Sequence, residues 1–190
     1  MNIKQMQDIL KNMITQERMI HSIGVSDTAK KLAKIYGEDI YKAQIAGLLH
    51  DCAKCLDKEQ MMYYVKKYNI YLDQIQIKEP ELAHGIIGAY VCKDVFKIDD
   101  EDILSSIIYH TTGKEDMTKL EKIIYIADFI EPNRDYPGVD KLRDVAFNEG
   151  LDKSLLMAFD NTIKYVISIK KVIHPITVKA RNYILDKLVD

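Results

Sequence analysis

The chain has 190 residues, which is enough for one well-filled core and too short for two ordinary domains. Apolar residues make up 47% and charged residues 29%, a composition that argues against global disorder. The 27 Lys and Arg residues against 29 Asp and Glu residues give a net charge of −2, which argues against a general nucleic-acid-binding protein. We therefore expect a single domain over residues 1–190.

The first 16 residues contain charges and no apolar run, so they do not resemble a signal peptide. The longest apolar stretches are far shorter than the roughly 18 residues that a membrane-spanning helix needs. The three cysteines, Cys52, Cys55 and Cys92, cannot all pair, which fits a reducing compartment. We expect a cytoplasmic protein that does not associate with membranes.

Helical spacing of apolar residues dominates the sequence. It occurs in segments at residues 3–13, 25–36, 43–53, 57–68, 79–96, 99–109, 118–130, 148–171 and 176–188. Several ends carry boundary signals: Gly37 is typical of a C-terminal cap, Asp57 of an N-terminal cap, and Thr118 with Glu121 of a capping box. Residues 131–139 (EPNRDYPGV) form the clearest loop. No segment predicts a strand, so we expect an all-α bundle of about eight helices.

Histidines and carboxylates recur together near predicted helix ends. They are His21, the pair His50-Asp51, His84, His110 and Asp128. Neutral imidazole and carboxylate are the natural ligands of Zn²⁺, Fe²⁺, Mn²⁺ and related ions. His50-Asp51 and Asp128 each follow or interrupt an apolar run, so their burial requires a neutralising partner. A bound metal ion would answer both requirements.

Each residue also has a simpler interpretation on its own. A single histidine on an apolar helix is more often a hydrogen-bonded core residue than a ligand, and Asp128 alone could pair with Arg134. The order His…His-Asp…Asp, with two further histidines between, is much harder to explain by chance. His/Asp ligation fits iron, manganese, cobalt, nickel and zinc almost equally.

This order resembles the HD superfamily of metal-dependent phosphohydrolases. The local sequence is most similar to the YqeK family of bacterial symmetrical diadenosine tetraphosphate hydrolases, over essentially the whole chain. The segments that carry the resemblance are HSIGVSDTAKKLAKIYG (21–37), GLLHDCAK (47–54), ELAHGIIGA (81–89), YHTTGKEDMTKLEKIIYIADFIEPNRDYPGV (109–139) and HPIT (174–177). The resemblance implies an all-α HD fold, a bound iron and ADP as the product.

The resemblance also implies roles for individual residues. The metal ligands would be His21, His50, Asp51 and Asp128. The residues facing the nucleotide would be Lys54, His84, His110, Asp128, Arg134 and the segment 174–177, in which Pro175 and Thr177 carry the match. His84, His110 and Asp128 would take part in catalysis. His84 and His110 could donate hydrogen bonds to a phosphate or hold a second metal.

General chemistry supports these assignments. A divalent ion lowers the pKa of a water that it binds, and cleavage of a phosphoanhydride then mostly requires positioning and neutralisation of charge. Lys54 lies about one helical turn after His50, and Arg134 follows Asp128 on the loop, where its guanidinium can bind a phosphate in two-pronged fashion. Alternatively, both cations are solvated surface charges.

Two other patterns have simpler interpretations. Cys52 and Cys55 form a CxxC without a second such motif, so we interpret Cys52 as core filler. Tyr63, Tyr64, Tyr109 and Tyr136 could stack on a base, although such tyrosines more often pack between helices.

The sequence thus predicts symmetrical hydrolysis of diadenosine tetraphosphate to two ADP. The alternatives are an HD phosphohydrolase for a dNTP or a guanosine polyphosphate, a nucleotide-binding regulatory module without turnover, and a di-iron HD oxygenase. The phosphate-binding cations Lys54 and Arg134 count against the oxygenase. The sequence is also compatible with a homodimer.

Overall fold

The computed structural model describes residues 1–189, and over this range it contains helices and no strands, as predicted. The α-helices are α1 (Ile3–Leu10), α2 (Gln16–Tyr36), α3 (Ile40–Leu49), α4 (Lys58–Tyr68), α5 (Gln74–Lys78), α6 (Pro80–Val91), α7 (Glu101–Tyr109), α8 (Lys119–Ile130), α9 (Val139–Asp144), α10 (Leu151–Ser168) and α11 (Pro175–Val189). Two π-helical turns, η1 (Cys92–Phe96) and η2 (Val145–Glu149), continue α6 and α9.

The boundary signals in the sequence are confirmed. Gly37 ends α2 with a φ of 64°, a left-handed conformation that glycine adopts without a steric penalty. At the start of α8, the Thr118 side chain accepts from the Glu121 N–H and the Glu121 carboxylate accepts from the Thr118 N–H. Asp57 forms a similar box with Gln60 at the start of α4.

The predicted helix over residues 148–171 is wrong in its first part. Gly150 has a φ of 143°, which separates the π turn η2 from α10. The helix expected at 43–53 instead begins at Ile40 and ends at Leu49, and turns follow it. The short helices α5 and α9 were not predicted, since five or six residues are too few to show helical periodicity.

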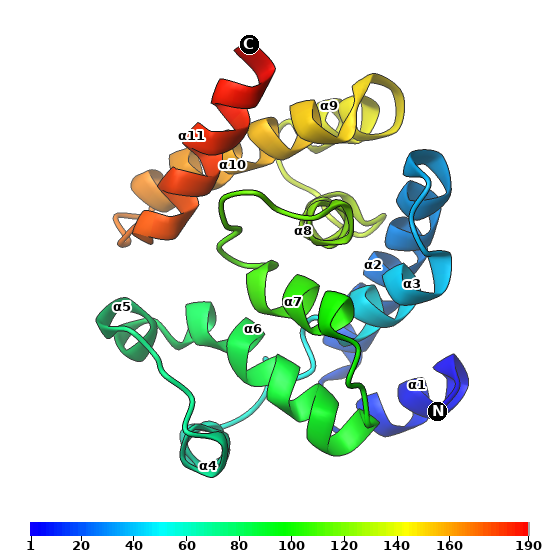
Figure 1. Ribbon diagram of the computed structural model, residues 1–190, viewed down its shortest axis with the longest axis vertical. Helices are drawn as coiled ribbons and strands as arrows, with labels where there is room; N and C mark the ends of the chain where they lie inside the picture. Colours follow the sequence, from blue (N-terminus) through cyan, green and yellow to red (C-terminus); the bar gives the residue numbers. More distant parts are fainter. Residues whose placement is uncertain (190) are drawn as a thin grey trace.

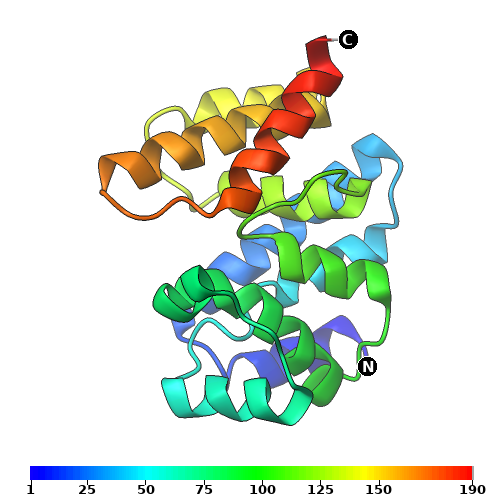
Figure 2. The same ribbon diagram turned by 60° about the vertical axis from the view of Figure 1, so that its left-hand side comes forward.

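Helix α8 occupies the middle of the molecule. Helices α2, α3 and α7 pack on one side of it, and α10 packs on the other, with α11 against α10 (Figure 1). Helices α9, α10 and α11 form one end of the molecule, while α1 and α4 lie at the opposite end (Figure 2). Among residues 1–189, no helix combines the length and the apolar character that crossing a membrane requires.

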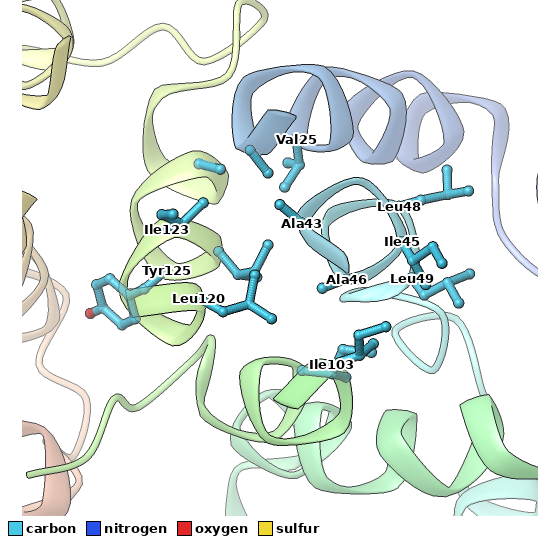
Figure 3. Packing of buried hydrophobic residues seen from close by; sticks show 14 of the residues in the cluster. Val25, Ala43, Ile45, Ala46, Leu48, Leu49, Ile103, Leu120, Ile123 and Tyr125 are labelled. Atoms are coloured by element: carbon cyan, nitrogen blue, oxygen red, sulfur yellow. The ribbon is translucent and has the colours of Figure 1, made fainter. Parts of the chain in front are cut away.

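The core around α3 brings the chemically interesting ends of the helices together. Val25 of α2, Ala46 of α3, Ile103 of α7 and Ile123 of α8 belong to one buried apolar cluster (Figure 3). A Cβ atom on Gly47 would lie 2.9 Å from the Cα of Ser26, so the backbones of α2 and α3 approach closely only because residue 47 is glycine.

Candidate active site

Six side chains from five parts of the chain converge beside this core. His21 lies in α2, His84 in α6 and Asp128 in α8, whereas His50 and His110 are the C-caps of α3 and α7, and Asp51 follows His50 directly. All are buried except Asp128, whose side chain is 17% exposed. The predicted histidines and aspartates therefore form one cluster, which we call the His–Asp cluster.

Asp51 connects two halves of the His–Asp cluster. Its Oδ1 atom lies 2.9 Å from Nε2 of His84 and 3.5 Å from Nε2 of His110. Its Oδ2 atom lies 3.7 Å from Nε2 of His50 and 3.9 Å from Nε2 of His21. Each half offers ligand atoms that lie within 4.8 Å of one another, as the donors of a single metal ion do.

Asp128 joins the half that contains His21 and His50. Its Oδ1 atom lies 3.0 Å from Nε2 of His21 and 3.7 Å from Nε2 of His50. The first half thus has two imidazoles and two carboxylates, a donor set suited to divalent first-row metals.

The hydrogen bonds of the histidines fix which ring nitrogen is free. Nδ1 of His50 donates to the Gly47 carbonyl at 2.8 Å, Nδ1 of His84 to the Glu81 carbonyl at 2.6 Å, and Nδ1 of His110 to the Ile107 carbonyl at 2.7 Å. A carbonyl oxygen can only accept, so in each neutral ring the Nε2 atom carries a lone pair. These Nε2 atoms point into the His–Asp cluster.

Two pairs of Nε2 atoms then face each other closely. The distance is 3.0 Å between His84 and His110 and 3.3 Å between His21 and His50. The two buried lone pairs of His84 and His110 repel at this distance unless a proton or a metal ion lies between or beside them. The His–Asp cluster therefore fits a divalent cation by its donor chemistry, its burial and its tautomers.

Burial and charge set the ionisation of the cluster. Burial lowers the pKa of His50 to about 4 and also lowers the pKa of His84, because the charged imidazolium is poorly solvated. Burial opposes ionisation of Asp51 too, but the neighbouring His50, His110 and His84 outweigh it and hold its pKa well below the usual range. For His21, burial is outweighed by the hydrogen bond and charge of Asp128, so its pKa is raised.

Three cations border the His–Asp cluster. Arg134, which the sequence singled out, donates from Nε to the Asp128 carbonyl at 2.8 Å and from Nη2 to Asp128 Oδ1 at 2.5 Å. Nζ of Lys54 lies 3.5 Å from Nδ1 of His84. Arg18 was missed by the sequence interpretation, yet its Nη1 lies 3.1 Å from Asp51 Oδ2. Its position three residues before His21 on one helix face was the available signal.

Glu131 is the second residue that the sequence interpretation missed. It is 1% exposed, and its Oε1 accepts from Nδ1 of His21 at 3.2 Å. Its Oε2 accepts from the backbone N–H and the side-chain amide of Asn133 at 2.8 and 2.9 Å. A Cβ atom on Gly24 would come within 2.4 Å of this oxygen, so glycine leaves the space that the carboxylate fills.

The loop after α8 is held by Arg143. This guanidinium donates to the carbonyls of Ile130, Glu131 and Arg134 at 3.1, 2.9 and 2.7 Å. These hydrogen bonds fix the backbone of Glu131 and Arg134 beside the His–Asp cluster.

The C-terminal segment does not join the cluster in the same way. Nε2 of His174 lies 2.7 Å from Asp73 Oδ2, and the buried Thr177 lies in the first turn of α11, where its N–H donates to the His174 carbonyl. Within residues 1–189, no hydrogen bond or ion pair connects Thr177 to the His–Asp cluster.

The other sequence patterns have structural explanations. Cys52 is buried, with its Sγ 3.7 Å from Sγ of Cys92, so the interpretation as core filler is confirmed. Cys55 is exposed. The Tyr136 hydroxyl donates to the Phe129 carbonyl, and Lys114 lies over the ring of Tyr109.

Comparison with known proteins agrees with this geometry. The model of the HD domain family matches residues 18–133, which contain all six members of the His–Asp cluster. A symmetrical bis(5'-nucleosyl)-tetraphosphatase of Staphylococcus aureus is 39% identical over 184 residues, covering 96% of this chain and 94% of that protein. The protein of the same name from Bacillus subtilis is 38% identical, covering 97% of this chain and 98% of its own.

A solved structure is similar throughout. The crystal structure of a predicted HD superfamily hydrolase involved in NAD metabolism from Clostridium acetobutylicum has a TM-score of 0.93 and 47% identity, and 98% of each chain is covered. The fold and the whole length of the chain are therefore shared with that protein.

Proposed function

We propose that this chain, which belongs to the HD domain family, hydrolyses diadenosine tetraphosphate symmetrically into two molecules of ADP. The observation that carries the proposal is the His–Asp cluster, in which unprotonated Nε2 atoms and carboxylates converge in a buried site bordered by cations. Full-length similarity to symmetrical bis(5'-nucleosyl)-tetraphosphatases supports the choice of substrate. We infer one domain over residues 1–190 that acts in the reducing cytoplasm, where Cys52 and Cys92 stay unpaired.

His21, His50, Asp51 and Asp128 would hold a divalent ion, which we propose to be iron. Such an ion supplies Lewis-acid chemistry and lowers the pKa of water to near neutrality. Manganese, cobalt, nickel and zinc bind the same donors. Metal analysis of the purified protein would therefore identify the ion. His84, His110 and Asp51 form the second half of the cluster and are the alternative location of a second ion.

The protein's own groups would position the substrate and balance its charge. Arg134 uses Nε and Nη2 on Asp128, so Nη1 is available for a phosphate oxygen, and Lys54 supplies a second positive charge. Asp128, fixed by His21 and Arg134, would orient the attacking water toward one of the two central phosphorus atoms. Thr177 would contact the nucleotide from α11.

His84 and His110 would assist departure of the leaving group. Attack on a central phosphorus breaks the central phosphoanhydride bond and expels a nucleoside diphosphate. This group is a weak base, so a strong general acid is not required; His84 or His110 would donate a hydrogen bond to it only after its Nε2 atom has gained a proton.

Product analysis tests the proposal. The protein, loaded with Fe²⁺ or Mn²⁺, is incubated with diadenosine tetraphosphate, and the products are separated by chromatography. We expect ADP alone; equal amounts of ATP and AMP would refute symmetrical cleavage. Parallel reactions with dNTPs and guanosine tetraphosphate test the alternative substrates. Binding without turnover of any nucleotide would instead support a regulatory module.

A further inference from the structure

An open groove lies between the turn after α1 and the helix α4. It has a volume of about 580 Å³ and is lined mainly by Met13, Cys55, Leu56, Gln60, Tyr63 and Tyr64. This volume is within the range of about 300–1,000 Å³ that small-molecule sites occupy. The groove shares no residue with the His–Asp cluster or with Arg134 and Thr177, so no function is yet attached to it.

Both walls of the groove lead directly to the His–Asp cluster. On one wall, Met13 is followed five residues later by Arg18, which is bonded to Asp51. On the other wall, Cys55 follows Lys54, whose N–H donates to the Asp51 carbonyl at 2.9 Å. A turn closed in this way keeps its end Cα atoms within about 7 Å, so the Cα of Cys55 lies within about 11 Å of that of Asp51. On each wall, a cation that contacts the cluster thus lies within five residues of a residue that lines the groove: Arg18 after Met13, and Lys54 before Cys55.

The lining of the groove suits a flat aromatic ring with a polar edge. The ring of Tyr63 is edge-on to that of Tyr64 at 5.4 Å, and the Tyr63 residue is 55% exposed. Met13 and Leu56 add apolar surface to the lining. Gln60 uses Oε1 to accept from the Asp57 N–H, which leaves its amide NH₂ for the edge of a base. Aromatic side chains stack on any nucleobase because every base has a π-face.

We propose that this groove binds the second nucleoside of a dinucleoside tetraphosphate, with Arg18 and Lys54 contacting the phosphates that lead to it. The inference rests on the proposed function. Symmetrical cleavage places one nucleoside diphosphate on each side of the reacting phosphorus, so two separate nucleoside positions are required. The residues Arg134 and Thr177 serve one of them, and the groove between α1 and α4 supplies the other.

The first test compares two substrates that differ by one nucleoside. Adenosine 5'-tetraphosphate can also release ADP but cannot fill both positions. We expect the wild-type protein to prefer diadenosine tetraphosphate in kcat/KM, and Tyr63→Ala to reduce this preference about tenfold. Tyr71→Ala removes a tyrosine that is 84% exposed and lies outside the groove, and it should leave the preference unchanged. An unchanged preference in Tyr63→Ala would overturn the inference.

The second test measures occupation of the groove without turnover. Cys55 is the exposed cysteine of the chain, whereas Cys52 and Cys92 are buried, so N-ethylmaleimide should label Cys55 selectively. A diadenosine tetraphosphate analogue with a central methylene bridge should slow this labelling at least fivefold, as followed by mass spectrometry. Inorganic tripolyphosphate, which has no nucleoside, should not slow it, and Cys55→Ser should stay unlabelled.

The two proposals fail in distinguishable ways. If the wild-type protein releases no ADP from diadenosine tetraphosphate, the proposed function fails and this inference fails with it. If ADP is released but Tyr63→Ala keeps the preference, or the analogue does not protect Cys55, the inference alone is wrong.

Discussion

Nε2 of His84 lies 3.0 Å from Nε2 of His110, and each ring donates its Nδ1 proton to a backbone carbonyl of its own helix. The nearest neighbour that these two Nε2 atoms have in common is Oδ1 of Asp51. A carboxylate oxygen cannot donate a proton to either lone pair. Gly85 permits this approach, since a Cβ atom there would lie 2.8 Å from the Ile107 carbonyl oxygen. The proximity of α6 and α7 thus creates half of the cluster.

Asp51→Asn should weaken metal binding in both halves of the cluster, because Asp51 offers one oxygen to each. His110→Ala should affect only the half that contains His84. Metal content after equilibration with Mn²⁺, measured by mass spectrometry, checks both variants. If the wild type binds two ions and His110→Ala binds one, the second ion belongs to the half that contains His110. If both proteins bind one ion, His110 is not a metal ligand and its proposed role is to contact the phosphates. The exposed Asp135→Asn serves as the control.

Glu131→Gln should weaken metal binding about 10- to 100-fold, the usual effect of losing an outer partner of a ligating histidine. Both oxygens of Glu131 accept hydrogen bonds, from Nδ1 of His21 and from the N–H groups of Asn133. In glutamine, one of these oxygens becomes an NH₂ group, which cannot accept, so one set of hydrogen bonds is lost. Glu121→Gln is the matched control: Glu121 is equally buried but pairs with Lys114, away from the cluster. Titration calorimetry with Mn²⁺ measures both, and equal affinities in the two variants would refute a positioning role for Glu131.

Arg134→Ala should raise KM for diadenosine tetraphosphate about tenfold while the metal stays bound, because we propose that the guanidinium binds a non-reacting phosphate. Arg134→Lys keeps the charge without the two-pronged geometry and should give an intermediate KM. Steady-state kinetics decides: a fall in kcat with unchanged KM would place Arg134 on charge that develops during the reaction. Arg181→Ala removes an arginine that pairs with Asp160 and should be without effect. Wild-type kinetics in Arg134→Ala would show a solvated surface charge.

The metal-free protein should lose stability as the pH falls from 6.5 to about 4. Burial lowers the pKa of His50 to about 4, whereas an unfolded histidine titrates near 6.5, so in this window the unfolded state binds a proton that the folded state rejects. The loss is about 1.4 kcal/mol per pH unit for this one group, and His84 acts in the same direction.

Urea unfolding at pH 6.5 and pH 4.5 measures this loss, and an NMR titration of the His50 ring identifies its source. Asp51 has a depressed pKa, so its contribution is lost only below its ordinary range, outside this window. A His50 ring that protonates near pH 6.5 in the folded protein would contradict the prediction.

The sequence predicted the helices whose ends carry chemical signals. Thr118 with Glu121, Asp57 and Gly37 act on their immediate neighbours, so a linear pattern reveals them. The break at Gly150 was missed because the surrounding residues keep helical spacing on both sides of it. A backbone with φ of 143° depends on how the flanking helices pack, which no local pattern expresses.

In the candidate site, too, some residues could be predicted from the sequence and others could not. His21, His50-Asp51 and Asp128 follow a spacing that a family pattern preserves. Arg18 and Glu131 come to the cluster by tertiary packing: Glu131 fills a space that Gly24, 107 positions earlier, leaves open. Such complementarity between distant residues requires coordinates.

Three helices point their C-terminal ends at the cluster. His50 and His110 are the C-caps of α3 and α7, and Asp128 lies in the last turn of α8. The aligned peptide dipoles place about half a negative elementary charge at each such end. Together with the carboxylates of Asp51, Asp128 and Glu131, these helix ends favour a cation and disfavour a polyphosphate chain at the centre of the cluster. We therefore infer that a cation enters this part of the site before the nucleotide does.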